Sequence, residues 1–541
     1  MAAADRDPEM NQKLPRRYFP FFDSTWRYLH VGVVIGIAAF WLSHGYQASE
    51  AAMQEIPPHS YRRIGLHSTG WFGYMWDTSD LQYRGFRYGL QDMSIGFILF
   101  VLVAQLLRGK FWSTEKSGQQ SSLTSVMGYY VMFGLGFTFY LHGVATVYLY
   151  AICVINYVMC KLVGGTKLAP AATWIFACTI LYLNKAYEGY VNNEFTDLMK
   201  RWSPIPQDHE NPIRWYMIFP MVCLRMISFN MDYHWMKSGR VVFDKARHLK
   251  KCDTCAEGIL CYRTRQESAQ DISTFNFTAY FAYLLYAPLY LAGPTTTFSA
   301  WISHIRLPQQ THSKKDIFVY AVRLIIVVLV CDVFMHLFYL HAICTRARFA
   351  LVQLDTMHIM ATSAILLIQL WLKFTLIWRL GRVFALMDGI ETPENMNRCV
   401  LNNYSFEGFW RSWHRSFNQW LIRYIYIPFG GNKSKGLTLI PVFLFVAYWH
   451  DIELKLFLWS WIIIIAISPE LALKAYFNRP QMNWLTSKWY WDYVCAFFAV
   501  IQILVMFAAN LIGFAIGYEV FLDFATKLFT TTAGYTTLMI T

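Results

Sequence analysis

Two Trp-His pairs are the residues of this sequence best suited to chemistry. The first supplies His414, within residues 409–420, and the second supplies His450, at the end of the apolar run 437–452. A charged side chain at the centre of a membrane helix costs about 2.5–3.5 kcal/mol, so ionisable residues are rarely kept there without a role. Imidazole can stay uncharged near pH 7 and can then act as a general base. The pattern therefore predicts a histidine-centred reaction inside a bilayer.

A buried histidine bonded to a backbone carbonyl is the alternative interpretation of either residue taken alone. Two imidazoles that bracket one basic, aromatic-rich segment favour a shared site instead. The helices that must position this site are read from the composition and from the apolar runs of the chain.

The composition is that of a membrane protein. The 541 residues are 56% hydrophobic and 15% charged, whereas soluble domains carry about 25% charged residues. The net charge of +13 lies mostly in short connections between apolar runs, as topology determinants do, which argues against a nucleic-acid binder. The 11 cysteines are odd in number and scattered, which is not a secreted disulfide framework.

The apolar runs predict an all-α polytopic protein. We expect one integral domain, residues 28–541, after a polar and basic cytosolic segment, residues 1–27, and we expect the first span to be a retained anchor. About 11 or 12 helices should span the membrane, tilt or re-enter. The apolar runs are 28–46, 93–107, 125–141, 144–162, 170–187, 215–229, 275–292, 318–341, 357–376, 437–449, 456–467 and 493–516.

Basic connections predict the topology. Arg108, Lys110 and Lys116, with the basic N-terminus, place these segments in the cytosol and residues 47–90 on the opposite side. The polar, aromatic-rich stretch 379–435 predicts amphipathic helices at the cytosolic face. Its cations are expected to attract an anionic cosubstrate such as a CoA nucleotide; they are Arg411, Arg415, Arg423, Lys433 and Lys435.

Three segments resemble the signature of membrane-bound O-acyltransferases (MBOATs). They are WRSWH at 410–414, LIRYIYIPFGG at 421–431 and WHDIELK at 449–455. Supporting stretches lie at 214–217, 224–230, 286–294 and 387–395. The chain most resembles the glycerol uptake protein branch, which is related to hedgehog acyltransferase. The resemblance runs from about residue 71 to about residue 517, and its signature region is about 379–470.

The resemblance implies an MBOAT fold around a through-membrane tunnel, with acyl-CoA arriving from the cytosol and the acceptor from the far side. It implies that His450 is the near-invariant catalytic histidine. His414 stands at a second site where members carry His, Asn or Asp, and it is a catalytic or substrate-orienting candidate. Attack of a hydroxyl on a thioester needs a base, for which His450 is suited, and a donor for the developing oxyanion, for which His414, a Trp indole or an Arg is suited. Tentative substrate-binding residues are Trp410, Arg411, Trp413, Asn418, Trp449 and Asp451.

Two cysteine sites are weaker candidates. Resemblance to hedgehog acyltransferase implies a haem-ligating thiol at Cys399, for which a small packed residue is the alternative. His248, Cys252, Cys255 and Cys261 lie in a basic loop with a Cys-x2-Cys spacing that suits zinc. The second pair is irregular, so free, palmitoylated or disulfide-bonded cysteines stay open for that loop.

The expected function is an endoplasmic-reticulum O-acyltransferase. Branch resemblance implies transfer of a long acyl chain from acyl-CoA to the sn-2 hydroxyl of a lyso-glycosylphosphatidylinositol (GPI) anchor, with membrane lipids and GPI-anchored proteins as partners and no nucleic acid. Acylation of a protein N-terminus or of a lysophospholipid is the alternative. A glycerol transporter is the alternative of another class, and it should show internal repeats and matched broken helices, which the sequence does not reveal by eye.

Overall fold

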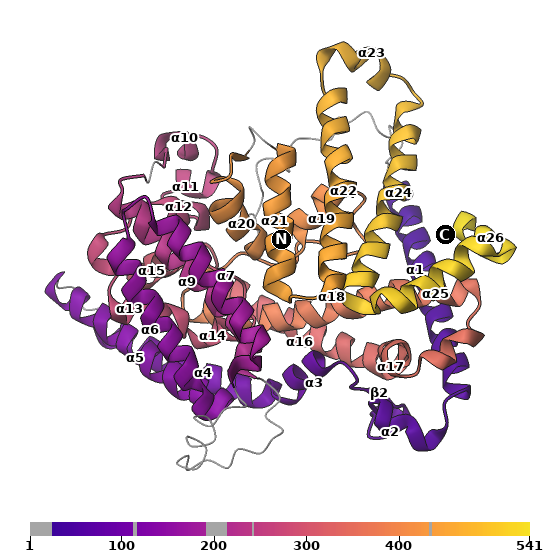
Figure 1. Cartoon of the computed structure of the whole chain (residues 1–541), viewed down its shortest axis with the longest axis horizontal. Coiled ribbons are helices and arrows are strands. Elements are labelled where there is room, and N and C mark those ends of the chain that lie inside the picture. Colours follow the sequence, from indigo (N-terminus) through magenta and orange to yellow (C-terminus); the bar gives the residue numbers. More distant parts are fainter. Residues whose placement is uncertain (1–23, 112–115, 191–213, 241–242, 432–434, 541) are drawn as a thin grey trace.

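A computed structural model describes residues 24–111, 116–190, 214–240, 243–431 and 435–540 of the protein. Helices dominate these residues (Figure 1), and the two short strands β1 (Leu66–His67) and β2 (Trp76–Asp77) form an antiparallel pair. The predicted all-α fold class is confirmed. Most of the predicted cytosolic segment, residues 1–27, lies outside the described residues.

The elements follow one another without a long connecting domain. The N-terminal part contains α1 (Ser24–Gln54), η2 (Pro58–Ser60), α2 (Tyr61–Ile64), η3 (Trp71–Gly73), α3 (Leu81–Tyr88), α4 (Leu90–Phe111), α5 (Lys116–His142), η4 (Gly143–Ala145), α6 (Thr146–Val163), α7 (Ala169–Ala186) and η5 (Glu188–Tyr190). The middle part contains α9 (Trp215–Lys237), α10 (Lys245–Leu249), α11 (Asp253–Ala256), α12 (Tyr262–Glu267), η6 (Ile272–Thr274), α13 (Phe277–Leu284), α14 (Ala287–Tyr290), α15 (Phe298–Arg306), α16 (Lys314–Leu337), α17 (Leu340–Arg346), η7 (Arg348–Gln353) and α18 (Thr356–Met387). The C-terminal part contains α19 (Phe406–Ser412), α20 (Arg415–Leu421), the π-helical turn η8 (Ile422–Tyr426), α21 (Lys435–His450), α22 (Leu454–Phe477), η10 (Pro480–Met482), α23 (Asn483–Thr486), α24 (Trp491–Asn510), the π-helical turn η11 (Leu511–Ala515), α25 (Gly517–Thr530) and α26 (Thr532–Ile540).

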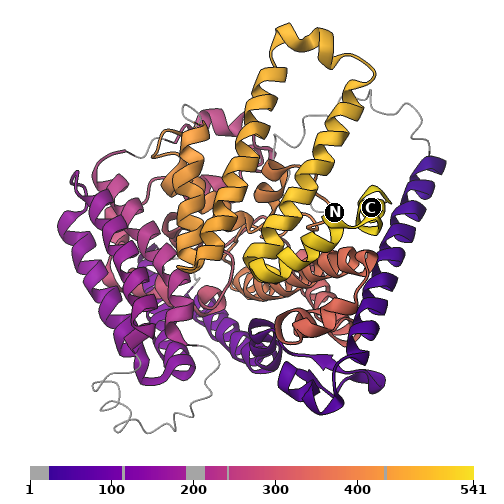
Figure 2. The same ribbon diagram turned by 45° about the vertical axis from the view of Figure 1, so that its right-hand side comes forward.

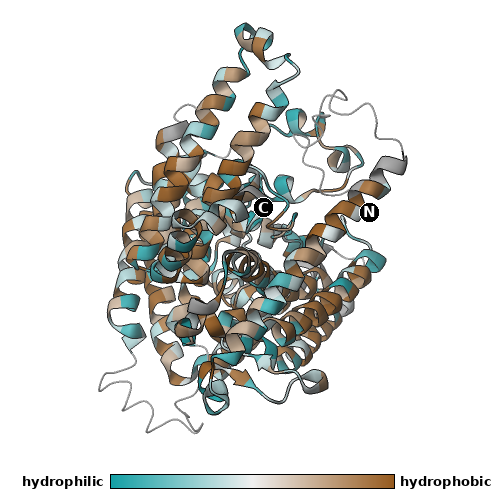
Figure 3. Cartoon of the chain, turned by 90° about the vertical axis from the view of Figure 1, so that its right-hand side faces the viewer, coloured by the Kyte–Doolittle hydropathy of each residue, from teal (hydrophilic) through white to brown (hydrophobic). Residues whose placement is uncertain are grey.

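The protein crosses the membrane several times. Among the described residues, seven helical stretches are long and apolar enough to span a bilayer, namely Val31–Gln54, Leu90–Gly109, Thr124–Val163, Lys314–Leu337, Thr356–Met387, Leu454–Phe477 and Trp491–Ala515. Figure 3 shows hydrophobic residues along these long helices, as lipid contact requires. Each predicted apolar run overlaps a helix, but the run 275–292 divides into the short helices α13 and α14, the second of which begins with a proline at its first turn.

The stretch 379–435 differs from the prediction. Its first residues continue α18 as far as Met387, and only α19, α20 and η8 are short helices of the expected kind. Arg423 is buried and ion-paired with Asp232 at 3.2 Å. Arg108 is also buried, and it donates a hydrogen bond to Tyr130 at 2.7 Å. Arg108 and Arg423 therefore bond partners inside the bundle, and Arg423 is not exposed to attract CoA.

The 32-residue helix α18 is the platform for the C-terminal half. Figures 1 and 2 show it lying across the molecule, with α21, α22 and α24 on one side of it. Its residues from Leu372 to Leu386 are almost all buried, and a Cβ added to Gly381 would stand 2.8 Å from the Pro288 carbonyl oxygen of α14. Small residues allow helices in membranes to approach in this way.

We expect Gly381→Ala to destabilise the protein by about 1–3 kcal/mol, because the new methyl group overlaps the backbone of α14 and cannot be accommodated by a rotamer change. Thermal unfolding in detergent measures the effect. Gly136→Ala in α5 is the matched control, since a Cβ there meets no atom within 4 Å. Equal unfolding temperatures for the two variants would contradict the tight contact.

Candidate active site

A cavity of about 500 Å³ lies in the C-terminal half, within the range of about 300–1,000 Å³ found for ligand sites. Most of its lining is apolar and aromatic, from α18 to α22, with Met506 of α24 and Phe514 of η11. Gln82 and Phe86 of α3 also line it. In Figure 1, α3 lies on one side of α18 and α19 to α22 on the other, so the cavity continues past this platform.

His450 is the last residue of α21 and lines the cavity. Its ring is accessible in this space, and it meets the rings of Trp449 at 4.6 Å and Phe514 at 5.2 Å between centroids. α21 is apolar along most of its length, with Pro441 inside it, and the imidazole stands where the helix ends. A ring placed in this way can receive a proton from a ligand in the cavity.

His414 lines the same cavity from the junction of α19 and α20. It is buried, and its ring stacks on Trp378 of α18 with centroids 4.5 Å apart. Its backbone adopts the left-handed conformation, with φ 45° and ψ 46°. Non-glycine residues are uncommon there, and His, Asn and Asp are several-fold enriched among them. These are the three residue types that the MBOAT resemblance implies at this site.

Polar groups from the preceding loop hold the bend at His414. The Ser416 backbone N–H donates to the Asn395 side-chain oxygen at 2.9 Å, and the Thr295 N–H donates to the Ser416 hydroxyl at 2.8 Å. His414 Nε2 is buried and has no hydrogen-bond partner among the described residues. An unpaired buried nitrogen costs about 1–3 kcal/mol, so a ligand that bonds it recovers that energy.

Trp449 lies between the two histidines. Its ring centroid is 6.3 Å from that of His414 and 4.6 Å from that of His450, and its indole N–H donates to the Pro220 carbonyl of α9 at 2.8 Å. The bond fixes the ring as a wall of the cavity. Trp449 therefore packs the two imidazoles into one site and has no indole donor left for a ligand.

Trp410, Trp413 and Asn418 also line the cavity, as predicted substrate-binding residues should. The indole Nε1 of Trp410 is buried and has no partner in the described part of the chain. The Trp410 ring packs edge-on against Trp459 at 5.4 Å. Trp410 Nε1 is therefore an unpaired donor, and His414 Nε2 is an unpaired donor or acceptor according to its tautomer, both on residues that line the cavity.

The remaining predicted site residues lie nearer its rim or outside it. Asp451 lines the cavity and accepts a hydrogen bond from Lys185 of α7 at 2.8 Å, which ties α7 to the α21–α22 junction. Arg411 does not line the cavity; it is exposed and ion-paired with Glu407 one helical turn earlier at 2.8 Å. A substrate role for Arg411 stays a prediction that this placement does not support.

Cys399 does not line the cavity, although Val400 and Leu401 do. Burial raises the pKa of its thiol, and the backbone N–H groups of Leu401 and Val400 act in the opposite direction. A raised pKa favours the neutral thiol, whereas a haem ligand is the thiolate. A bound metal itself deprotonates its thiol ligand, and haem binding at Cys399 stays a prediction of the resemblance alone.

Five polar residues of the lining were missed from the sequence, namely Gln82, Lys373, Glu453, Lys455 and Asn510. Lys373 of α18 lines the cavity and is ion-paired with Asp80 at 2.6 Å, and Asn510 at the end of α24 accepts a hydrogen bond from the Trp459 indole at 3.4 Å. Glu453 lies beside the α21–α22 junction. Lys373 and Asn510 stand inside apolar runs. A polar residue in an apolar run is the same signal that predicts His450, and it would have identified both residues.

A helical membrane protein with two imidazoles facing one internal apolar cavity belongs to the class of intramembrane enzymes. Residues 192–516 match the membrane-bound O-acyltransferase family. The chain is 34% identical over 487 residues to the membrane-bound O-acyltransferase gup1 of Schizosaccharomyces pombe, covering 88% of this chain and 80% of the relative. It is also 34% identical to GUP1 of Saccharomyces cerevisiae, covering 91% and 84%. The chain therefore belongs to the MBOAT family and is an acyltransferase.

Similarity to a protein acyltransferase is weaker and shorter. The protein-cysteine N-palmitoyltransferase HHAT of Mus musculus is 25% identical over 208 residues, which cover 37% of this chain and 41% of the relative. The sequence motifs resemble both groups, and both resemblances are thus confirmed. The match to the O-acyltransferases covers more of the chain.

Trp410→Phe is expected to lower acyl transfer about tenfold, because it removes the unpaired indole N–H while it keeps a smaller aromatic ring against Trp459. Tenfold corresponds to a hydrogen bond to the substrate worth about 1.4 kcal/mol. The rate at saturating acyl donor measures it. Trp461→Phe is the matched control, since this indole is exposed on α22 and lies outside the cavity. A wild-type rate for Trp410→Phe would exclude the indole as a substrate donor.

Proposed function

We propose that this acyltransferase moves a long acyl chain from acyl-CoA to a lipid hydroxyl, with His450 as the general base. The observation that carries the proposal is the accessible His450 ring in a mostly apolar cavity. An apolar cavity accommodates an acyl chain, and an uncharged imidazole accepts a proton near pH 7.

The proposed chemistry is a direct transfer. A nitrogen of His450 takes the hydroxyl proton as the acceptor oxygen attacks the thioester carbonyl carbon. The tetrahedral intermediate then collapses, the C–S bond breaks, and the proton goes to the leaving CoA thiolate. Oxygen has replaced sulfur on the acyl carbon, and no serine or cysteine nucleophile takes part.

The developing oxyanion needs a donor in the cavity wall. His414 Nε2 and Trp410 Nε1 are both unpaired in the described residues, which supports them for this role. Loss of one such donor typically costs about 10²–10³ in rate. Trp449 is excluded from the role, because its indole already bonds Pro220.

For the acceptor we propose the sn-2 hydroxyl of a lyso-GPI anchor in the endoplasmic reticulum. This rests on the resemblance to the glycerol uptake branch and on the greater extent of the O-acyltransferase relatives. With the N-terminus in the cytosol, α1 begins on the cytosolic side, together with the α22–α24 tip (Figure 2). Acyl-CoA then enters from the side of α19 to α22, and the acceptor from the side of α3, where Gln82 and Phe86 line the cavity.

The experiment is a transfer assay with purified protein in lipid nanodiscs. Labelled palmitoyl-CoA is offered with lyso-GPI, with a lysophospholipid, or with a peptide bearing a free N-terminus. We expect an ester product on lyso-GPI alone, formed at least about a hundredfold more slowly by the His450→Ala protein. Preferred acylation of the lysophospholipid or of the peptide would replace the acceptor and leave the enzyme class unchanged.

The glycerol transporter makes a different prediction for the same protein. Vesicles that contain a transporter would accumulate labelled glycerol without any acyl donor. The His450→Ala variant would not have to lose this glycerol uptake. Family membership and the internal histidine site favour the enzyme, so we expect no glycerol uptake above that of protein-free vesicles.

A further inference from the structure

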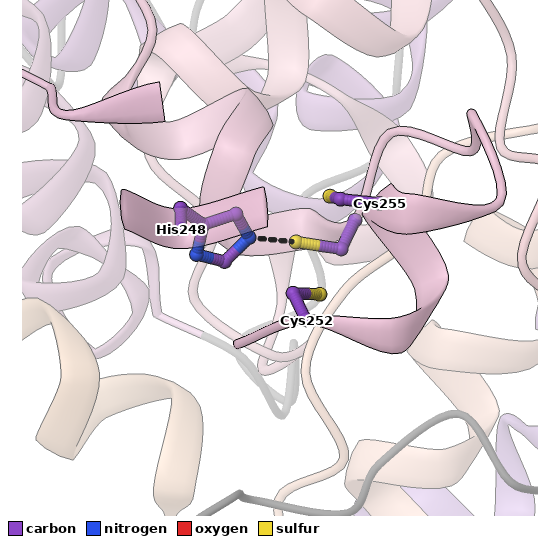
Figure 4. A group of neighbouring side chains, drawn as sticks. His248, Cys252 and Cys255 are labelled. Atoms are coloured by element: carbon purple, nitrogen blue, oxygen red, sulfur yellow. Dashed lines mark hydrogen bonds between the residues drawn. The ribbon is translucent and has the colours of Figure 1, made fainter. Parts of the chain in front are cut away.

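A second cluster of reactive side chains lies outside the acyltransferase cavity, on three short helices. His248 belongs to α10, Cys252 caps α11, Cys255 lies within α11, and Cys261 caps α12. One ligand atom from each of the four residues lies within 4.8 Å of all the others. Figure 4 shows His248, Cys252 and Cys255 facing one another. From this geometry we propose that the four residues bind one zinc ion as a structural Cys₃His site.

The distances suit tetrahedral zinc. Zn–S bonds of about 2.3 Å and Zn–N bonds of about 2.0–2.1 Å place neighbouring ligand atoms about 3.5–3.8 Å apart. Cys261 Sγ already lies 3.3 Å from His248 Nε2, and no pair in the cluster exceeds 4.8 Å. Shifts of up to about 1 Å, or a rotamer change of one cysteine, complete the coordination. A centre with four protein ligands is closed, which is typical of structural zinc and not of catalytic zinc.

The neighbouring groups are those that support metal-bound thiolates. The Thr264 backbone N–H points at Cys261 Sγ at 3.4 Å. The Thr264 hydroxyl lies 3.2 Å from Cys255 Sγ and 3.4 Å from Cys261 Sγ. Hydrogen bonds to the ligands orient them and tune the metal. Cysteine is not among the residues preferred as a helix N-cap, and a metal-bound thiolate is a far better acceptor for that position than a thiol.

The charge of the segment also suits such a centre. Zinc with three thiolates and a neutral histidine carries a net charge of −1. Residues 245–267 contain six Lys or Arg residues against three Asp or Glu residues. The surrounding excess of positive charge stabilises thiolates and hence the metal complex.

The helices that carry the ligands need such a link. α10, α11 and α12 have five, four and six residues, and isolated helices shorter than about 12 residues are marginal in water. Helices linked by zinc would also be tied to the end of α15, because Arg265 of α12 donates a hydrogen bond to the carbonyl of Leu307, the C-cap of α15, at 2.7 Å. It would also brace the active-site segment, because Glu267 of α12 forms an ion pair with Arg423, which follows α20 in η8.

The location agrees with zinc rather than a disulfide. Figures 1 and 2 place α10 to α12 on the same side as the α22–α24 tip, which is cytosolic in the proposed orientation. Thiols stay reduced in the cytosol, where cysteine clusters of this spacing bind metal. Cys255 is buried, which also makes it a poor site for palmitoylation.

The first test is the metal content of the wild-type full-length protein, purified in detergent with no zinc added and no chelator. We expect one zinc ion per chain by mass spectrometry, and Zn–S distances of about 2.3 Å by X-ray absorption. Modification of the thiols by a mercurial should release zinc in step with the reaction, as a chromophoric chelator reports. Protein that is monodisperse but free of zinc, or that contains a disulfide within this cluster, would overturn the proposal.

The second test compares Cys252→Ser with Cys495→Ser. Cys495 is exposed on α24, outside both the cluster and the cavity, so its variant should keep zinc and the wild-type unfolding temperature. Cys252→Ser should lose most of the zinc and unfold at a lower temperature. Full zinc occupancy in Cys252→Ser would overturn the four-ligand site. Neither test uses acyl transfer, so failure of the zinc proposal and failure of the proposed acceptor are separate outcomes.

Discussion

Replacing His450 with alanine is expected to lower acyl transfer by about 10²–10⁴-fold, the range that a general base supplies. The ring stands at the end of α21 in the cavity, and within the described residues no side-chain hydrogen bond fixes it to the protein. Its removal should therefore leave the unfolding temperature close to that of the wild type. The rate with saturating palmitoyl-CoA and acceptor measures the effect, and the loss should appear in kcat rather than in KM.

His450→Phe separates proton transfer from packing. Phenylalanine keeps a ring against Trp449 and Phe514 but has no nitrogen to accept a proton. It should be as inactive as the alanine variant. His59→Ala is the matched control, because His59 is exposed in η2 and does not line the cavity. A His450→Phe protein that transfers within a few fold of the wild-type rate would remove His450 from the mechanism.

The position of this histidine was predictable because it breaks a local pattern. An imidazole at the end of an apolar run is visible without knowledge of the fold, and the same holds for the Trp-His pair at His414. The cavity they share was not derivable from the residues alone, since part of its wall comes from α3 and α9, which lie far earlier in the sequence. It followed from the family resemblance, and the shared cavity is what the structure adds.

The errors in the prediction concern cations whose partners are distant in sequence. Arg108 donates a hydrogen bond to the Asp388 backbone carbonyl, which is 280 positions away in the sequence. Arg423 donates one to Asp232, which is 191 positions away. Sequence shows such a residue as an unpaired charge near the end of an apolar run, which predicts an interface location. Burial with a partner costs less than burial alone, so a chain can keep these charges inside the bundle.

The bend at His414 is the second feature that no local pattern reveals. Backbone at φ 45° is strained for most residues, and the hydrogen bonds that Ser416 forms with Asn395 and Thr295 hold it there. The bend turns the imidazole onto Trp378, and its Nε2 is buried without a partner among the described residues. His414 therefore combines a backbone role with a side-chain role, and the two can be separated by substitution.

His414→Gly is expected to lower acyl transfer by about 10²–10³-fold, because it removes a proposed oxyanion donor. Glycine adopts the left-handed backbone freely, whereas alanine is strained there. His414→Ala should thus lose as much activity and be less stable than His414→Gly by about 1 kcal/mol. His414→Asn should retain part of the activity, since asparagine both tolerates this backbone and offers an N–H donor. Transfer rates and unfolding temperatures of the three variants measure the two roles independently.

The order of the three rates decides between the roles. If the side chain donates to the substrate, activity follows the donor, with Asn above both Gly and Ala whatever their stabilities. If His414 serves only the bend, activity follows the backbone, and His414→Gly transfers at close to the wild-type rate while His414→Ala does not. That second order would leave Trp410 as the unpaired donor beside His450, since the Trp449 indole is already bonded to Pro220.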